Sequence, residues 1–254
     1  MKKDGTTCVH GLRAAQAALQ RRPEAVLRVL YARARQAELA PLLAQARDLG
    51  REVREAEPDE LARLARSVHH GGVVVITRPL PLLSRDELLR RLPRGAVLLA
   101  LDGVANPHNL GAILRSAAWF GASAVLFPGG PGQAHLTPAA LRTAMGAAEA
   151  VPLAAVGDLP QALRRLTREG VQVVAAEVQG GEPLPSAALT RPVCLVLGNE
   201  EQGLTPAVRA ACPRRVTLPG TGAVESLNVS VVAGVLLAAA TRDGPGAVMC
   251  GASL

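Results

Sequence analysis

The chain has 254 residues, of which 49% are apolar, so one or two folded domains are expected and disorder of the whole chain is excluded. No apolar run reaches the ~18 residues that a membrane-spanning helix needs. The first residues, MKKDGTTCVHG, contain lysines but no apolar segment, so we expect no signal peptide and, by default, a cytoplasmic protein.

The positive charge of the chain is confined to its first third. Residues 1–94 hold 18 basic and 11 acidic residues, whereas residues 95–254 hold ten of each. This asymmetry favours a polyanion-binding part followed by a neutral part with another task. The alternative is that an Arg- and Ala-rich chain only reflects genome composition. Because aromatic residues make up 2% of the chain, we expect nucleic-acid contacts to use Arg and phosphate rather than base stacking.

The cysteines and histidines do not form a metal-binding pattern. No two cysteines make a CxxC pair, and the adjacent His69 and His70 are far in sequence from any cysteine. We therefore predict reduced, structural cysteines and no metal site. The cysteines are Cys8, Cys194, Cys212 and Cys250.

The first part of the chain predicts a small α/β domain over residues 1–78. Helical and strand patterns alternate there, which is typical of a compact α/β domain. Helices are expected at 11–22, 36–50 and 58–66, and strands at 25–32, 51–57 and 71–77. Pro79, Pro81 and Pro93 then mark a linker over residues 79–94. Within this linker Ser84 and Glu87 form the capping box of a short helix.

The second part, residues 95–244, predicts a parallel sheet with helices on both faces, because short apolar strands alternate with helices. Strands are expected at 96–102, 123–128, 171–177, 193–198 and 214–219, and helices at 109–120, 137–148, 159–169, 205–211 and 226–241. Ligands bind beyond the carboxyl ends of the strands in such sheets. The loops at 102–109, 198–204 and 219–226 are therefore the candidate site, and residues 245–254 are expected to be a flexible tail.

The first candidate loop carries two polar residues of interest. Asn109 stands before an apolar-periodic helix, where it is expected to be the N-cap, and a plain capping role is the alternative to a functional one. Arg115 follows six residues later among apolar neighbours such as Ile113 and Ala117. This setting favours a buried or cleft-lining arginine over a solvated charge.

The other two loops combine glycines with polar residues. Gly198 and Gly203 flank Glu200 and allow close backbone approach to a ligand, but no GxGxxG pattern indicates a dinucleotide site. In the third loop, Ser226 or Glu225 is expected to cap the last helix, with Asn228 in its first turn. A capped core helix is the alternative for this loop alone. Polar groups from three strand ends together favour one shared site.

Three stretches, NPHNLGAILRSA, LVLGNEEQGL and LPGTGAVESLNVSVVAGVLL, resemble the signature motifs of the SpoU/TrmH class of SPOUT RNA methyltransferases. The segments VHGLRAAQAAL and HHGGVVV resemble the L30e-like RNA-binding domain of bacterial 23S rRNA guanosine 2'-O-methyltransferases. The likeness covers nearly the whole chain. It implies an α/β-knot domain with a deep C-terminal trefoil knot, S-adenosylmethionine as cofactor, and a homodimer whose active site lies near the subunit interface.

The resemblance also implies which residues act. We expect Arg115 to hold a phosphate and to stabilise the developing alkoxide, because an arginine stays protonated and is a poor base. Asn109 and Asn228 would orient the ribose or Arg115, and Glu200 would pair with Arg115 or cap a loop. Ser226 would bond the substrate or help to organise the pocket. The expected cofactor-binding residues are Leu197, Gly198, Leu218, Pro219 and Leu227.

The function implied is RNA ribose 2'-O-methylation, with 23S ribosomal RNA favoured over transfer RNA as the substrate. One alternative is an RNA- or ribosome-binding protein that has lost catalysis, against which the complete set of motif residues counts. The other is an unrelated α/β nucleotide-binding enzyme, which the missing Walker and Rossmann patterns disfavour. The sequence assigns no role to His69 and His70.

Overall fold

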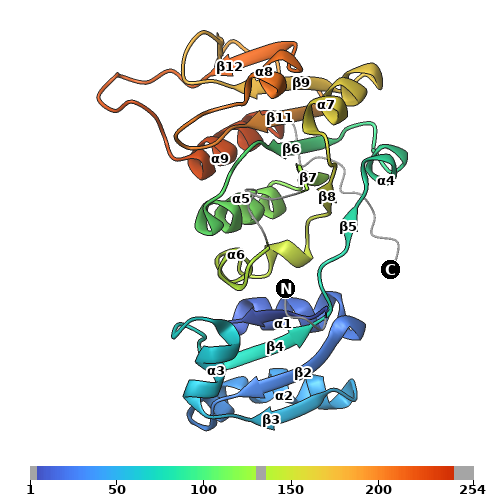
Figure 1. The fold of residues 1–254 in the computed structure, drawn as a ribbon, viewed down its shortest axis with the longest axis vertical. Coiled ribbons are helices and arrows are strands. Elements are labelled where there is room, and N and C mark those ends of the chain that lie inside the picture. Colours follow the sequence, from blue (N-terminus) through green and yellow to red (C-terminus); the bar gives the residue numbers. More distant parts are fainter. Residues whose placement is uncertain (1–4, 130–135, 243–254) are drawn as a thin grey trace. The chain divides into compact units, whose positions relative to one another are not determined.

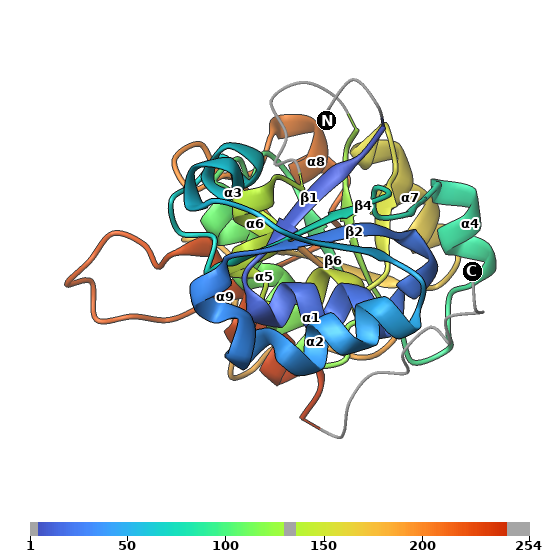
Figure 2. The same cartoon turned by 90° about the horizontal axis from the view of Figure 1, so that it is seen from below.

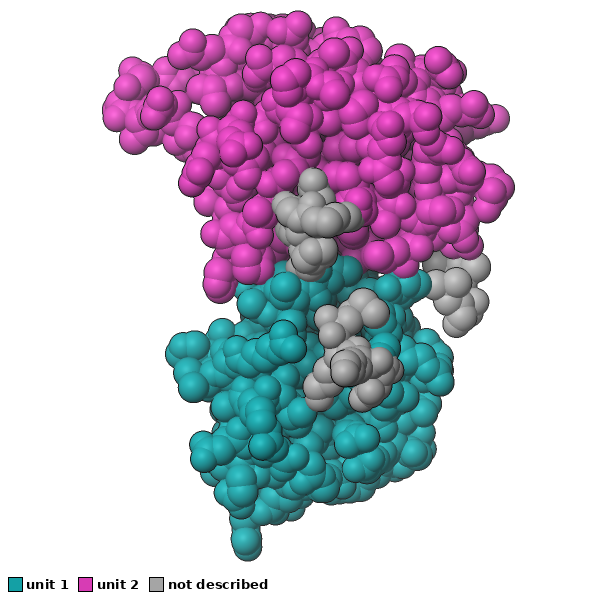
Figure 3. All heavy atoms as spheres, viewed as in Figure 1, with its two compact units in different colours: residues 1–81, 136–150 teal, residues 82–135, 151–254 magenta. Residues whose placement is uncertain are grey.

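The computed structural model describes residues 5–129 and 136–242 and divides the chain into two units, coloured separately in Figure 3. Unit 1 contains residues 1–81 and 136–150, and unit 2 contains residues 82–135 and 151–254. The domain boundaries drawn from the sequence stay predictions. The expected tail at 245–254 lies outside the described residues.

Unit 1 is built on a four-stranded sheet of order β1-β4-β2-β3 (Figures 1 and 2), in which β4 pairs antiparallel with β1 and β2, and β2 pairs parallel with β3. The predicted helices and strands of this part are confirmed, but β1 was missed because four residues are too few to show an alternation. The strands are β1 (Thr7–His10), β2 (Val26–Tyr31), β3 (Glu52–Glu55) and β4 (Val73–Thr77), and the helices are α1 (Leu12–Arg21), α2 (Gln36–Asp48) and α3 (Pro58–Ala65), with 3-10 turns η1 (Pro23–Ala25) and η2 (Arg33–Arg35).

Residues 136–150 belong to unit 1, although the sequence placed them in the second domain. The single helix predicted over 137–148 is wrong, because the chain forms α6 (Pro138–Thr143) and a separate 3-10 turn η3 (Ala147–Glu149). Met145 and Gly146 both have positive φ between them, which a continuous helix does not allow. A Cβ on Gly146 would lie 2.5 Å from the Cβ of Ala17, so α1 requires glycine at this point.

A buried ion pair fixes this segment within unit 1. The guanidinium Nε of Arg22, directly after α1, lies 2.5 Å from Oε2 of Glu149, and the two side chains are only 14% and 4% exposed. A second bond joins the Arg22 Nη2 to Glu149 Oε1 at 3.0 Å. The remaining Arg22 Nη1 donates to the Pro79 carbonyl at 3.1 Å. A planar guanidinium therefore holds three chain segments of unit 1 together.

Unit 2 contains the predicted parallel sheet. Every strand pair in it is parallel, and the order is β10-β12-β9-β11-β6-β7-β8-β5 (Figure 1). The five predicted strands are confirmed, and three very short strands were missed. The strands are β5 (Leu82–Leu83), β6 (Val97–Leu101), β7 (Ala124–Phe127), β8 (Leu153–Ala155), β9 (Gln172–Ala176), β10 (Glu182–Pro183), β11 (Val193–Leu197) and β12 (Arg214–Thr217).

Helices cover both faces of this sheet, as its strand sequences require. Alternate residues such as Leu98 and Cys194 form one core with α7 and α8, while the intervening Leu99 and Leu195 are equally buried. On the other face α9 contacts β11 and packs beside α5 (Figure 1). The helices are α4 (Arg85–Arg90), α5 (Pro107–Trp119), α7 (Leu159–Arg168), α8 (Pro206–Ala210) and α9 (Val229–Ala240). Within the described ranges no helix is long and apolar enough to cross a membrane.

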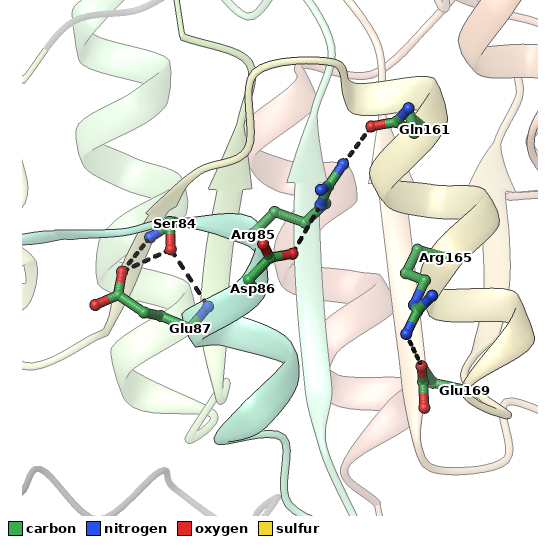
Figure 4. A network of polar contacts seen from close by, with 7 residues as sticks. All are labelled: Ser84, Arg85, Asp86, Glu87, Gln161, Arg165 and Glu169. Atoms are coloured by element: carbon green, nitrogen blue, oxygen red, sulfur yellow. Dashed lines mark hydrogen bonds and ion pairs between the residues drawn. The ribbon is translucent and has the colours of Figure 1, made fainter.

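The predicted capping box of α4 is confirmed (Figure 4). The Ser84 hydroxyl accepts a hydrogen bond from the Glu87 amide, and the Glu87 carboxylate accepts one from the Ser84 amide. Arg85 in the next position donates to Gln161 of α7, which links this helix to α7 at the surface of unit 2.

Strand β11 lies between β6 and β9, both of which precede it in the chain. Its residues pair with β6 from Val193 to Leu197 and with β9 from Val193 to Val196. Because all these strands run parallel, their carboxyl ends meet at one edge of the sheet. The trefoil knot implied by the resemblance stays a prediction.

Replacing Glu149 with glutamine leaves Arg22 buried without a counter-charge. We expect the free energy of unfolding of unit 1 to fall by about 3 kcal/mol, measured by hydrogen exchange of the α1 amides in the full chain. The matched control is Glu52→Gln, because the Arg28–Glu52 pair of unit 1 is exposed by 49% and 54% and is worth less than about 1 kcal/mol. Equal effects of the two substitutions would contradict the role given to the buried pair.

Candidate active site

The loop after β6 is tied to the loop after β11. Asp102, which is 5% exposed, accepts a hydrogen bond from the Thr205 amide at 2.7 Å through its Oδ2. The Asn199 Nδ2 donates to the Gly103 carbonyl at 2.7 Å. These two bonds fix the positions of two neighbouring strand ends relative to each other.

The loop after β11 is a tight turn closed by its own backbone. Asn199 and Gly203 exchange two backbone hydrogen bonds of 2.9 and 3.0 Å, and the Asn199 Oδ1 accepts from the Glu201 amide at 2.9 Å. A Cβ on Gly198 would lie 2.6 Å from the Gly203 carbonyl oxygen. Only glycine therefore fits at Gly198, which leaves the backbone of this turn close to the cavity described below.

A chain of side-chain hydrogen bonds joins all three candidate loops. The Asn228 Oδ1 accepts from both the amide and the hydroxyl of Ser230, at 2.9 and 2.6 Å, so its amide nitrogen is free to donate. That Nδ2 donates to the Asn109 Oδ1 at 3.1 Å, and the Asn109 Nδ2 donates to the Glu200 carboxylate. Each amide is thereby held in one orientation, and Asn109, Glu200 and Asn228 lie together.

Two predicted helix caps are wrong. The N-cap of α5 is Asn106, whose side chain accepts from the His108 amide at 2.9 Å, so Asn109 lies inside the first turn and its side chain is free for the Glu200 contact. The last helix begins at Val229 rather than 226, and Asn228 caps it in place of Ser226 or Glu225. Residues 221–228 are all exposed and extend from unit 2 (Figure 1).

Arg115 is exposed, so the expectation of a buried or cleft-lining arginine is wrong for the single chain. Six residues separate it from Asn109, which places the two side chains on different faces of α5. The Arg115 side chain shares its face with Trp119, which lies one turn later and is 83% exposed. Glu200, its expected partner, bonds to Asn109 instead.

A cavity of about 730 Å³ opens at the carboxyl edge of the sheet. Its wall consists of the turn after β11, the loop after β12, the start of α9 and the residues after β9. Glu200 and Ser226 contribute to this wall, as do all five predicted cofactor-binding residues: Leu197, Gly198, Leu218, Pro219 and Leu227.

Sequence reasoning missed Glu177, which follows β9 directly and lines the same cavity. Its carboxylate pairs with Arg209 of α8 at 2.8 Å, and its side chain is 11% exposed. The sequence signal that could have revealed Glu177 is an acidic residue directly after a strand of apolar residues. Burial, followed by the negative charges of Glu177 and Asp102, raises the pKa of the Cys212 thiol to about 12. This thiol is neutral at pH 7, which excludes it as a nucleophile.

Within residues 5–129 and 136–242, no group of three or more His, Cys, Asp or Glu side chains is placed to hold a metal ion. The chemistry that the site offers is therefore hydrogen bonding by two asparagines, a serine hydroxyl, a carboxylate and backbone groups, beside a partly apolar cavity.

Two family models match the chain. Residues 96–238 match the SpoU rRNA Methylase family, and residues 8–83 match RNA 2'-O ribose methyltransferase substrate binding. Among curated relatives, the 23S rRNA (guanosine-2'-O-)-methyltransferase RlmB of Pseudomonas putida is 38% identical over 92% of this chain and 96% of its own length. RlmB of Bordetella pertussis is 35% identical over 95% of this chain and 99% of its own length.

Solved structures with both units are similar as well. An AdoMet-bound rRNA methyltransferase from Sinorhizobium meliloti has a TM-score of 0.77 and 26% identity, covering 95% of this chain and 88% of its own. The SpoU methyltransferase AviRb from Streptomyces viridochromogenes, in complex with AdoMet, has a TM-score of 0.77 and 25% identity, covering 95% and 91%.

Replacing Gly198 with alanine places a methyl group against the backbone of Gly203 and Leu204. Since neither backbone group moves without breaking the turn, we expect destabilisation of more than about 3 kcal/mol and deformation of the cavity wall. Thermal unfolding measures the first effect. The control is Gly95→Ala, because a Cβ at Gly95 meets no atom within 4 Å and its φ is not positive. Similar unfolding temperatures for both variants would show that the space between Gly198 and the backbone of Gly203 and Leu204 accommodates a methyl group.

Proposed function

Since the chain belongs to the SpoU rRNA methylase family, we propose that it transfers a methyl group from S-adenosylmethionine to the ribose 2'-hydroxyl of a guanosine in 23S ribosomal RNA. The observation that carries this proposal is the pair of hydrogen bonds that joins the side chains of Asn228, Asn109 and Glu200 beside the cavity. These residues come from the three motifs of the family, and the relatives with this activity match both units of the chain.

The cavity fits the cofactor in size and in lining. Small-molecule sites enclose roughly 300–1,000 Å³ and combine apolar walls with a few polar groups, and the cavity meets both conditions. Leu197, Leu218 and Leu227 would enclose the adenine, and the backbone of Gly198 and Pro219 would contact its polar edge. When bound, S-adenosylmethionine supplies the methyl group that is transferred.

The residues of the chain then act on the RNA. Asn109 and Asn228 hold each other in fixed orientations and would position the ribose, while the Glu200 carboxylate keeps the Asn109 amide in place. Ser226, exposed at the cavity wall, would hydrogen-bond the substrate. Arg115 would bind a phosphate and stabilise negative charge on the 2'-oxygen as the hydroxyl proton passes to solvent water, because a guanidinium stays charged in nearly any setting and does not itself accept that proton.

A homodimer would complete this site. Arg115 lies on an exposed face of unit 2 that also presents Trp119, Val231 and Val235, which are 83%, 50% and 40% exposed. These apolar side chains come from α5 and α9, which pack side by side (Figure 1). Apolar residues clustered on an open helix face favour a protein partner. A second copy seated there would bring an arginine toward each cavity from the neighbouring chain.

The site of action proposed is the cytoplasm, where ribosomal RNA is available as substrate. Transfer RNA remains the second candidate substrate, and a TrmH/SpoU tRNA modifying enzyme of A. aeolicus matches 60% of this chain with a TM-score of 0.52. That match covers less of the chain than the matches to rRNA methyltransferases do, so ribosomal RNA is the better supported substrate.

Replacing Arg115 with alanine should abolish methyl transfer and leave cofactor affinity nearly unchanged, because this side chain lies outside the cavity wall. The assay is transfer of labelled methyl from S-adenosylmethionine to 23S ribosomal RNA and to transfer RNA from cells lacking the gene. Arg168→Ala, which removes an exposed arginine of α7, is the control and should transfer at the wild-type rate. Equal loss of transfer and of cofactor binding in Arg115→Ala would contradict the role given to it. Cofactor binding without label in either RNA would point to a ribosomal assembly intermediate as the substrate, whereas absence of both cofactor binding and label would favour a non-catalytic RNA-binding protein.

A charge in the apolar face should separate the two copies. We expect Val231→Asp to convert the protein from dimer to monomer in sedimentation experiments and to lower methyl transfer by at least ten-fold, because a carboxylate buried at an interface lacks a partner. Leu82→Asp is the control, since Leu82 is also exposed, by 45%, but lies in the edge strand β5 and outside the cavity wall. A wild-type protein that sediments as a monomer at micromolar concentration would overturn the dimer proposal.

A further inference from the structure

The charged side chains in the wall of the unit 2 cavity are all acidic. They are Glu177, Glu200 and Glu225, and among the described residues that line the cavity there is no Lys, Arg or His. The whole chain carries a net charge of +7, so this wall differs in sign from the protein to which it belongs. A cavity whose charged groups are all negative favours a ligand that carries positive charge.

Glu177 is more buried than the other two carboxylates of this wall. Its side chain is 11% exposed, whereas Glu200 and Glu225 are exposed residues. Water and salt screen the field of an exposed charge, but the field of a buried charge passes through protein of lower dielectric constant. Glu177 therefore acts more strongly on a ligand in the cavity than its two exposed neighbours do.

The sheet fixes the position of Glu177. This residue follows β9 directly, and β9 lies between β11 and β12 (Figure 1). The segments that follow these two strands form much of the cavity wall. The Glu177 amide still donates to the Val216 carbonyl of β12 at 2.9 Å, so the strand pairing holds this residue at the cavity.

The ion pair of Glu177 has its negative member in the cavity wall. Arg209 of α8 donates through Nη2 to Oε2 at 2.9 Å, and its Nε lies 2.8 Å from Oε1. The Arg209 side chain is 51% exposed and is not part of the wall. Oε1 is buried and makes no hydrogen bond with a residue that the structure describes. Water thus screens the positive charge of the pair more than the negative one.

The cofactor and its product differ in charge at one atom. S-adenosylmethionine is a sulfonium, whereas S-adenosylhomocysteine, which remains once the methyl group has been transferred, is a neutral thioether. Adenine, ribose, ammonium and carboxylate are the same in both, so contacts with these groups cancel when the two affinities are compared. The ratio of the two dissociation constants therefore reports how the cavity treats the charge on sulfur and the methyl group itself.

We propose that Glu177 is a specificity-determining residue that makes the cavity favour the charged cofactor over its neutral product. The carboxylate stabilises the sulfonium but not the thioether, so the product leaves more readily and inhibits less. Arg209 limits this preference because it neutralises part of the carboxylate charge. The inference rests on the proposed methyl transfer and adds to it the charge selectivity of the cofactor cavity.

The test compares the dissociation constants of the two ligands by titration calorimetry with the full-length protein and without RNA. In Glu177→Gln, the ratio of the constant for S-adenosylhomocysteine to that for S-adenosylmethionine should fall about five-fold, as for unit charges about 8 Å apart at a dielectric constant of about 40. In Arg209→Gln the ratio should rise, because the same carboxylate loses its counter-charge. A purely structural ion pair would weaken both ligands equally in the two variants.

The matched controls are Glu182→Gln and Arg214→Gln. These residues form an ion pair of 2.6 Å between β10 and β12, and neither lines the cavity. Both substitutions should leave the ratio close to the wild-type value. The proposal is overturned by an unchanged ratio in Glu177→Gln, by shifts of the same sign in Glu177→Gln and Arg209→Gln, or by equal shifts in the controls.

Methyl transfer is measured separately, in the presence of added S-adenosylhomocysteine. At a fixed concentration of S-adenosylmethionine, Glu177→Gln should be inhibited by less of this product than the wild type, and Glu182→Gln should match the wild type. A wild-type protein that binds the cofactor but transfers no methyl group would contradict the proposed function alone, since the ratio of dissociation constants still decides the role of Glu177. A wild-type protein that binds neither ligand would overturn both.

Discussion

The position of β11 between β6 and β9 is the constraint on which the site depends. A fully apolar parallel strand is stable only with neighbours on both sides and helices on both faces, and β11 has both. Its insertion brings the loop after it directly beside the loop after β6. At Gly198 the turn has no room for a side chain, so the backbone itself forms the cavity wall at that point.

Side-chain amides convert this arrangement of strands into a specific geometry. Asn228 uses its oxygen to cap α9, and this use directs its nitrogen to Asn109, which in turn donates to Glu200. A cap and a candidate active-site contact are therefore made by one residue. Because each group in the chain is oriented by the previous one, side chains from the three loops meet in one arrangement, as transfer chemistry requires.

The two units differ in the amount and placement of their charged residues. Residues 1–81 and 136–150 of unit 1 hold 15 basic and 10 acidic residues, whereas unit 2 holds 13 and 11, so most of the excess positive charge lies in unit 1. Unit 2 instead places the buried Asp102 and the largely buried Glu177 near the carboxyl edge of its sheet. RNA attraction by one unit and local positioning by the other suit an enzyme that must hold a large polyanion and act on one hydroxyl.

The sequence by itself determined the family, the parallel sheet of unit 2, and most helices and strands. It also determined the short helix capped by Ser84 and Glu87. Local periodicity and capping depend on residues that are close together in the sequence, so both can be recognised without the tertiary structure. Tertiary structure decided the rest. The N-caps of α5 and α9 are Asn106 and Asn228 rather than the residues expected from the sequence. The orientation of α5 leaves Arg115 exposed. Residues 136–150 belong to unit 1, where Glu149 pairs with Arg22. The partners in that pair are 127 residues apart, so no local pattern could reveal them. Such contacts exist only once folding has brought distant segments together.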